Sequence, residues 1–531
     1  MQQLTAHRDT IRKLTSADET RVIEQLREKF DPGPELRSRS NARARKLVEK
    51  IRSEGKPGLM EIFLAEYGLS TDEGVALMCL AEALLRVPDT PTIDELIEDK
   101  ISPSSWGEHL GGSSSPLVNA STWALMLSGK VLKEPNRSGV VDLLRGTVKR
   151  LGEPVIRLAI QRAMKEMGHQ FVLGQTIDEA IRRGKTFEKQ GYVYSYDMLG
   201  EAALTSKDAT DSFHAYCEAI RTLSLNTDSD NITENPGVSI KLSALHPRYE
   251  LGQKVRVMDE LAPRVRELAI LAKSAQMGLN VDAEESDRLD LSLDVIEAVF
   301  RSKDLAGWDG FGVVVQAYGK RASAVIDWLY AISSELDRKI MIRLVKGAYW
   351  DTEIKLAQIK GVDDFPVFTT KAATDVSYIC CASQLLNMTD RIYPQFATHN
   401  AHTVSSILEM AKDRTAFEFQ KLHGMGDSLH DLVVLRSEEV KSRIYAPVGA
   451  HRDLLAYLVR RLLENGANSS FVNQIMNKDV PAEVVAADPF ELVDQEQNSN
   501  SANVIKPAAL FQPERPNSAG WDLSNVNDLA K

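Results

Sequence analysis

The segment 457–468 (YLVRRLLENGAN) carries the residues whose types and spacing point most directly to chemistry. On an α-helix, Tyr457, Arg460, Arg461 and Glu464 fall at i, i+3, i+4 and i+7 and share one face. Two adjacent guanidinium groups beside an aromatic ring and a carboxylate can clamp a small carboxylate ligand, because arginine binds such groups through paired hydrogen bonds. The same pattern also occurs in exposed helices laced with ion pairs. The rest of the chain decides between these interpretations.

From about residue 190, short β-rich runs alternate with helical stretches and would position such a helix. The runs are 194–199, 238–245, 279–283, 312–317, 340–345, 395–399, 417–422 and 443–447. The stretches between them, such as 255–277 and 322–336, are long enough for crossover helices. This alternation indicates an α/β protein with a parallel sheet, and eight strands are the number that closes a TIM-type (βα)8 barrel. A doubly wound open sheet is the alternative that the pattern leaves open.

The ends of these runs carry polar residues, and in a TIM barrel the active site gathers at the carboxyl ends of the strands. In strand order they are Glu201; Lys241; Asp282, Glu284 and Glu285; Gln316 and Tyr318; Arg343, Lys346, Tyr349 and Trp350; Thr398, His399 and Asn400; Gln420 and His423; and Tyr445. Lys241 lies between two aliphatic residues, so we expect it to point into the barrel and to need a partner such as Asp282. An interior salt bridge without catalytic role is the alternative for that pair.

The densest of these segments is 343–350 (RLVKGAYW). An arginine and a lysine followed by Gly347 suit an anionic ligand that approaches the backbone closely. A flavin fits as well as a nucleotide, because a cation near its N1/N5 region stabilises the reduced ring. His399 is either a core histidine or a cofactor contact, and we expect 423–426 to form a turn rather than a phosphate loop. The chain has neither a G-x-G-x-x-G nor a P-loop motif.

The composition is that of a globular protein with several folded units: 531 residues, of which 43% are hydrophobic and 26% charged. We predict a helical arm and α-domain over 1–125, a linker and long helix over 126–185, the barrel over 186–485, and a linker or tail over 486–531. A net charge of −11 argues against a general nucleic-acid binder. No apolar run is long enough to span a membrane, and the N-terminus lacks an apolar signal core.

Four cysteines without CxxC spacing predict free thiols in a reducing cytoplasm and no metal site. Two of them, Cys380 and Cys381, lie in an apolar helical run and are expected to be buried. Helices are also expected near 15–19, 43–51, 71–85 and 138–167, and a loop over 102–115.

Four segments, 343–350, 393–402, 417–425 and 457–468, together resemble the FAD-dependent proline dehydrogenases. The match is closest to the proline dehydrogenase part of the bacterial bifunctional proline utilisation (PutA) flavoenzymes and covers roughly residues 20–490. The resemblance implies a distorted (βα)8 barrel that holds FAD, preceded by a helical arm and helical domain. It also implies oxidation of L-proline to Δ1-pyrroline-5-carboxylate by hydride transfer to flavin N5. Electrons would pass to ubiquinone while the cytoplasmic enzyme associates peripherally with the inner membrane.

The same resemblance implies roles for individual residues. Arg460 and Arg461 would grip the proline carboxylate, Glu201 would pair with the second arginine and gate the pocket, and Arg343 would lie beside flavin N5. Substrate-pocket positions match Lys241, Asp282, Tyr349, Leu422, Tyr445 and Tyr457. The implied catalytic set is Lys241, Asp282, Arg343, Tyr349, Tyr445, Arg460 and Arg461. Flavin-contacting positions match Asp282, Gln316, Arg343, Val345, Lys346, Gly347, Ala348, Trp350, Thr369, Lys371, Thr398, His399, Asn400, Gln420 and Glu464.

The amine base and the class of protein stay open at this point. The proline amine must be neutral before hydride leaves, and its base is Asp282, Lys241 or water. A flavin barrel reductase that uses NAD(P)H is the competing enzyme hypothesis, and a DNA-binding or scaffold protein is the non-enzymatic one.

Residues 1–15 lead directly into the helical region without a ribbon-helix-helix module, so we predict no DNA-binding role. Residues 505–531 resemble the lead-in to an aldehyde dehydrogenase domain, whose activity we expect this chain to lack.

Overall fold

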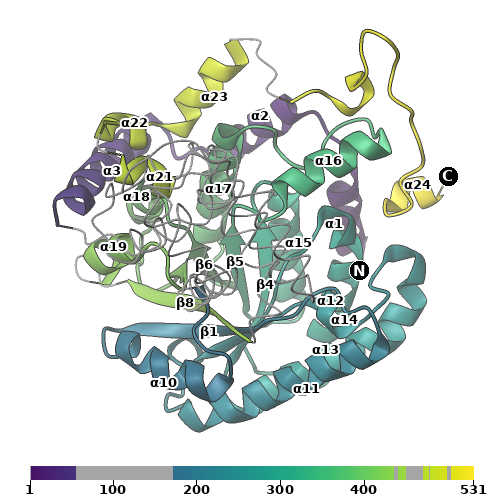
Figure 1. Ribbon diagram of the computed structural model, residues 1–531, viewed down its shortest axis with the longest axis vertical. Helices are drawn as coiled ribbons and strands as arrows, with labels where there is room; N and C mark the ends of the chain where they lie inside the picture. The colour runs from purple at the N-terminus through teal and green to yellow at the C-terminus, as the bar shows by residue number, and fades with distance from the viewer. Residues whose placement is uncertain are drawn as a thin grey trace, which may run out of the picture.

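Eight parallel strands close into a barrel in the computed structural model, which describes residues 2–54, 171–435, 440–449, 471–477, 479–498 and 504–530 (Figure 1). The strands are β1 Tyr192–Met198, β2 Gly237–Ile240, β3 Gly278–Val281, β4 Phe311–Gln316, β5 Ile340–Val345, β6 Ile392–Ala397, β7 Glu418–Leu422 and β8 Lys441–Val448. Each strand pairs with the next one in sequence, and β1 pairs with β8 from Tyr192↔Ser442 to Met198↔Val448. The predicted barrel is therefore confirmed, and the open sheet is excluded.

All eight predicted strands occur, but the second was predicted too long. β2 ends at Ile240, and Leu242–Leu245 form the short helix α12 instead. All four residues of α12 are buried, so their apolar character could not distinguish a buried helical turn from a strand. The break leaves Lys241 between the two elements, with its backbone N–H donating to the Tyr216 hydroxyl at 3.2 Å.

Helices surround the barrel, and several of them begin at capping residues that sequence rules favour. In chain order they include α10 Ile177–Glu188, α11 Ser206–Leu223, α13 Lys254–Ser274, α14 Leu289–Phe300, α15 Ala322–Glu335, α16 Trp350–Lys360, α17 Lys371–Leu386, α18 Ala401–Met410 and the short α19 Asp427–Leu429. Thr205 and Asp208 form a capping box at α11, and the side chains of Thr370 and Asn400 cap α17 and α18. The glycine-containing segment 423–426 is a turn, as predicted, with Gly426 at a φ of 67°.

The N-terminal arm consists of α1 Gln2–Lys13, α2 Glu19–Phe30 and α3 Pro34–Glu54, which lie against α15, α17 and α18 respectively (Figure 1). The predicted helix start near 15–19 is confirmed, because Asp18 caps α2. Arg8 of α1 donates to Asp290 and Asp294 of α14 at 3.2 and 3.0 Å, 282 and 286 residues away in the chain. The arm is thus joined to the barrel wall by ion pairs as well as by apolar packing.

Several predicted features lie outside the described residues: the helices over 71–85 and 138–167, the loop over 102–115, and Cys79. Cys380 and Cys381 are buried free thiols, as predicted, and Cys217 is a buried free thiol as well. The polar tail contains a helix, α23 Pro489–Asn498, which packs on α17, and Asn517 donates to the Gln358 carbonyl of α16 at 2.7 Å. The domain boundaries stay predictions. No helix in the described ranges is long and apolar enough to cross a bilayer.

The apolar contact between α2 and α17 yields a stability prediction. Ile23 is 1% exposed in a cluster with Val376 and Ile379 of α17. Ile23→Ala should lower the free energy of unfolding by about 2–5 kcal/mol, since it removes buried methyl groups and leaves a cavity. Urea unfolding followed by circular dichroism measures this. Val255→Ala, at a side chain that is 77% exposed, is the matched control, and equal midpoints for the two variants would contradict the packing described.

Candidate active site

Arg343 of β5 occupies the centre of the barrel, where it is 2% exposed. Its guanidinium donates to Ser239 Oγ at 3.0 Å, to Asp282 Oδ1 at 2.9 Å and to Ser195 Oγ at 3.1 Å. Its Nε donates to Gln420 Oε1 at 2.7 Å. A planar cation is therefore fixed by residues from strands on both sides of the barrel, which is the arrangement that a buried charge requires.

Lys241, Asp282 and Tyr445 gather beside this arginine, as their positions at strand ends predicted. The Tyr445 hydroxyl donates to Asp282 Oδ2 at 2.7 Å, and the Arg343 guanidinium carbon lies 5.1 Å from the Tyr445 ring centre. Lys241 Nζ lies 3.4 Å from Asp282 Oδ2, which confirms the expected ion pair. Its shorter contact, however, is with Asp197 Oδ1 at 2.7 Å.

Asp197 places a buried carboxylate in this cluster, and its charge needs partners. Its side chain is wholly buried, and its second oxygen has no hydrogen-bond partner within the described structure. Burial raises the pKa of Asp197 although the charge of Lys241 opposes the shift. Burial would lower the pKa of Lys241, but the charges of Asp197, Tyr445 and Asp282 outweigh it and raise that pKa. Lys241 is therefore protonated at neutral pH.

The hydrogen bonds of Arg343 form one polar layer in the barrel, and a second polar layer lies beneath it. Glu418 of β7 accepts from Gln420 at 2.6 Å, from Gln395 at 3.0 Å and from Arg443 at 2.8 Å. Gln395 in turn accepts from Asn280 at 2.8 Å. Because Gln420 belongs to both layers, the ion pair of Glu418 and Arg443 fixes the orientation of the amide that holds Arg343.

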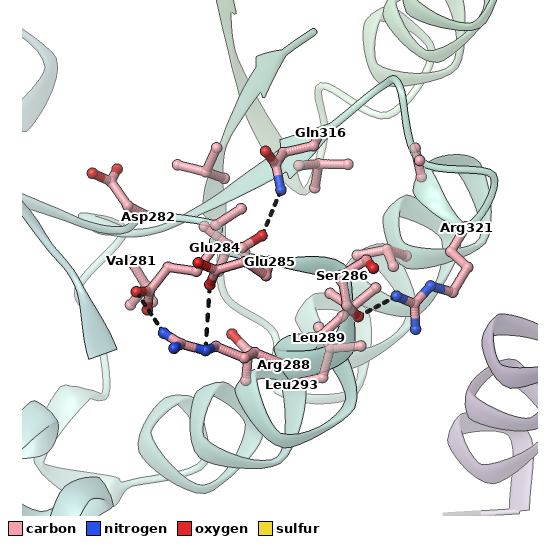
Figure 2. Close-up of a pocket in the computed structure, with 18 of the residues that line it drawn as sticks. Val281, Asp282, Glu284, Glu285, Ser286, Arg288, Leu289, Leu293, Gln316 and Arg321 are labelled. Atoms are coloured by element: carbon pink, nitrogen blue, oxygen red, sulfur yellow. Dashed lines mark hydrogen bonds and ion pairs between the residues drawn. The ribbon is translucent and has the colours of Figure 1, made fainter. Parts of the chain in front are cut away.

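The loop after β3 joins the site to the next barrel helix (Figure 2). Figure 2 shows Arg288 facing the carboxylates of Glu284 and Glu285, at 3.1 and 3.3 Å, while Asp282 is turned away from them. Gln316 donates to the Glu284 carbonyl at 2.9 Å and accepts from the Ala348 N–H at 3.4 Å. A cavity of about 60 Å³ lies between these residues and α14, enough for about two water molecules.

The segment after β5 is held in a close-packed turn. Gly347 has a φ of 149°, and a Cβ there would lie 2.4 Å from the Tyr318 ring. The Trp350 indole N–H donates to the Phe368 carbonyl at 2.8 Å. The Thr369 N–H is bound by the Glu19 carboxylate of the arm at 3.0 Å. The side chain of a larger residue at 347 would displace this turn, so glycine is required there.

The remaining predicted positions that the structure describes lie at the same end of the barrel. Val345 ends β5, and its carbonyl accepts from Ala317 at 2.8 Å. His399 Nε2 accepts from the Leu422 N–H at 3.1 Å, and Thr398 Oγ1 accepts from the Asn400 N–H at 3.1 Å.

Lys346 and Lys371 share one carboxylate, that of Asp375. Glu201 and Tyr349 follow β1 and β5, at the same end. Tyr457, Arg460, Arg461 and Glu464 lie outside the described residues.

Sequence reasoning missed Ser195, Asp197, Ser239, Asp375, Glu418 and Arg443. Most of them lie within strands rather than at the strand ends, where the active site of a TIM barrel is expected. A signal was present in β1, since Ser195 and Asp197 are two residues apart and therefore point to the same face. Within the described ranges, no three His, Cys, Asp or Glu side chains are grouped so as to hold a metal ion.

Comparison with known proteins assigns the family. Residues 180–474 match the family model described as proline dehydrogenase. The chain is 47% identical to the bifunctional protein PutA of Salmonella typhimurium and 49% identical to that of Rhizobium meliloti, over 96% of its length in each case. The chain belongs to the proline dehydrogenase family. A crystal structure of a Bradyrhizobium japonicum PutA mutant is 46% identical and superposes with a TM-score of 0.76 over 97% of this chain and 52% of that one.

The chain spans 40% of the length of the Salmonella relative. Residues 5–52, which include most of the arm, match the N-terminal domain of the proline utilization A proline dehydrogenase. Residues 59–171 match a model described as the DNA-binding domain of proline dehydrogenase. The prediction that this chain has no DNA-binding role is therefore not supported, and all but the last of those residues lie outside the described structure.

The buried pair of Lys241 and Asp197 yields a pH-dependent prediction. Lys241→Met should lower the free energy of unfolding by about 3–5 kcal/mol, because it leaves a buried carboxylate without its cation. Burial already raises the pKa of Asp197, and a raised carboxylate pKa costs stability as the pH rises through it. The loss should therefore be larger at pH 8 than at pH 5.

Urea unfolding at the two pH values measures this loss. Adding Asp197→Asn to Lys241→Met should restore much of the stability, and Lys303→Met, at an exposed lysine, serves as control. A loss that is the same at both pH values and is not recovered in the double variant would contradict the interpretation.

Proposed function

We propose that this chain is an FAD-dependent dehydrogenase that oxidises L-proline to Δ1-pyrroline-5-carboxylate, the first step of proline catabolism. One observation supports it above all. The stretch that matches the proline dehydrogenase family forms a closed barrel with Arg343, Lys241, Asp282 and Tyr445 converging at one end. By analogy with the family, electrons would then pass to ubiquinone during peripheral contact with a membrane. In a full-length protein an aldehyde dehydrogenase domain would take the product further.

The residues present fit FAD. Arg343 offers a fixed cation at the barrel centre, suited to the electron-rich edge of a reduced flavin ring. Lys346 and Lys371 offer two ammonium groups for phosphates, and the Gly347 turn allows close approach to the backbone. We assign Asp282, Gln316, Val345, Ala348, Trp350, Thr369, Thr398, His399, Asn400, Gln420 and Glu464 to the same cofactor. When bound, FAD supplies the hydride acceptor.

Proline would be held by Arg460 and Arg461 through its carboxylate, with Tyr457, Tyr349, Tyr445 and Leu422 around its ring. Those assignments rest on the family resemblance for the residues outside the described structure. Glu201, from the loop after β1, would pair with Arg461 and close the pocket. Fixed cations around a small carboxylate orient the substrate and exclude water, so the ring carbon next to nitrogen is held for transfer.

Lys241 is a poor acceptor for the amine proton, because its ammonium group is paired with Asp197 at 2.7 Å and with Asp282 at 3.4 Å. Asp282 accepts hydrogen bonds from Arg343 and Tyr445, so both of its carboxylate oxygens already have a donor. Asp282 or a water molecule therefore remains as the acceptor of the amine proton.

The test is a steady-state assay of the FAD-loaded protein with an artificial electron acceptor. L-Proline should support acceptor reduction and yield a cyclic imine product, whereas NADPH with the same acceptor should not. Reduction by NADPH alone would favour the flavin reductase hypothesis, and protein that reduces the acceptor with neither compound would overturn the proposal.

Arg461→Met should raise the Michaelis constant for proline by roughly tenfold to a hundredfold, since a charged hydrogen bond to the carboxylate contributes about 1.5–3 kcal/mol. FAD content should be unchanged. Arg266→Met, at an exposed arginine of α13, is the control. An unchanged Michaelis constant in Arg461→Met would remove that arginine from the substrate site.

A further inference from the structure

Asp375 joins two lysines that come from different parts of the barrel. Lys346 follows β5, and Lys371 is the first residue of α17, one helical turn before Asp375. Lys371 Nζ lies 3.0 Å from Asp375 Oδ2, and Lys346 Nζ binds the other oxygen, Oδ1. Each carboxylate oxygen therefore holds one ammonium group.

The three side chains of this cluster differ in how far they are exposed to solvent. Asp375 is 11% exposed, whereas Lys346 and Lys371 are 29% and 46% exposed. The carboxylate thus lies on the inner side, and the ammonium groups lie nearer to solvent. Burial alone would raise the pKa of Asp375, but the two lysines outweigh it and lower that pKa to about 2. The cluster therefore carries two positive charges and one negative charge at neutral pH.

An ordinary surface ion pair does not account for the arrangement. An i,i+4 pair such as Lys371 and Asp375 contributes little by itself. Here the same carboxylate also reaches across to Lys346, 29 residues away in the chain and beside the Gly347 turn. Two ammonium groups held on one carboxylate repel each other. The excess positive charge, close to the N-terminus of the 16-residue helix α17, suits an anion on the solvent side.

We propose that Asp375 is a positioning residue that holds Lys346 and Lys371 as a pair for the phosphate groups of the dinucleotide cofactor, which it does not itself touch. The inference rests on the proposed FAD-dependent function and deepens it. Asp375 sets the spacing of the two cations before the cofactor arrives, so that their side-chain entropy is not lost on binding.

Charge and positioning predict opposite results when Asp375 is changed. Asp375→Asn removes a negative charge beside the lysines, so a purely electrostatic site would bind a dianion more tightly. A positioned pair loses its anchor, so binding weakens although the local charge is more positive. The direction of the change therefore separates the two explanations.

The experiment titrates cofactor-free protein with FAD and follows the change in flavin fluorescence. Asp375→Asn should weaken the dissociation constant by about tenfold, equivalent to the loss of about 1.4 kcal/mol, and Asp375→Glu should lie between it and the parent. Asp259→Asn, at an exposed carboxylate of α13, should bind as the parent does. Equal or tighter binding in Asp375→Asn would overturn the inference.

A second variant guards against a folding defect. Lys371→Gln changes a partly exposed side chain, and the double variant Lys371→Gln/Asp375→Asn completes a cycle. If Asp375 acts through Lys371, Asp375→Asn should weaken FAD binding less in the Lys371→Gln background than in the parent. Fully additive losses would instead assign Asp375 a general structural role. Failure of the parent protein to bind FAD would overturn the proposed function itself and is distinct from either result.

Discussion

The guanidinium of Arg343 is a full charge inside a closed barrel, and much of the interior is organised around it. Its partners come from β1, β2, β7 and the residue after β3, while the Tyr445 ring of β8 lies beside it. A buried cation without such partners would cost several kcal/mol. The barrel therefore has to keep these strands in one register to satisfy it. The same contacts hold the guanidinium of Arg343 in one orientation at the barrel centre.

The contacts of Arg343 connect to the polar side chains beneath it, and further contacts join the arm to the outside of the barrel. Gln420 connects Arg343 to the ion pair of Glu418 and Arg443, so the second polar layer and the site share one side chain. Lys241 and Asp197 add a second buried pair beside the first. On the outer side the arm reaches the segment before α17 through Glu19, whose carboxylate accepts a hydrogen bond from the Thr369 N–H. A side chain near the start of the chain thus holds the segment that leads into α17.

The sequence predicted the barrel because the strands alternate with helices over a long stretch, and that periodicity is local. It also predicted Lys241, Asp282, Arg343 and Tyr445 together, since parallel strands bring their carboxyl ends to one rim. It did not predict the pairing of Lys241 with Asp197. The alternation along a strand shows which face a side chain lies on, but it does not show which residue across the barrel is its partner. Contacts such as Arg8 with Asp290 join residues 282 positions apart, and no local pattern encodes them. The α12 segment was mistaken because a fully buried turn and a strand are equally apolar.

The most direct test is an anaerobic absorbance spectrum of the FAD-loaded protein before and after L-proline is added. We expect L-proline to bleach the oxidised flavin band. D-Proline, whose carboxylate and ring cannot be placed together in the same way, should do so far less. That result would establish that electrons pass from this substrate to this cofactor. A flavin spectrum that L-proline leaves unchanged, in protein that retains its cofactor, would overturn the proposed proline dehydrogenase activity.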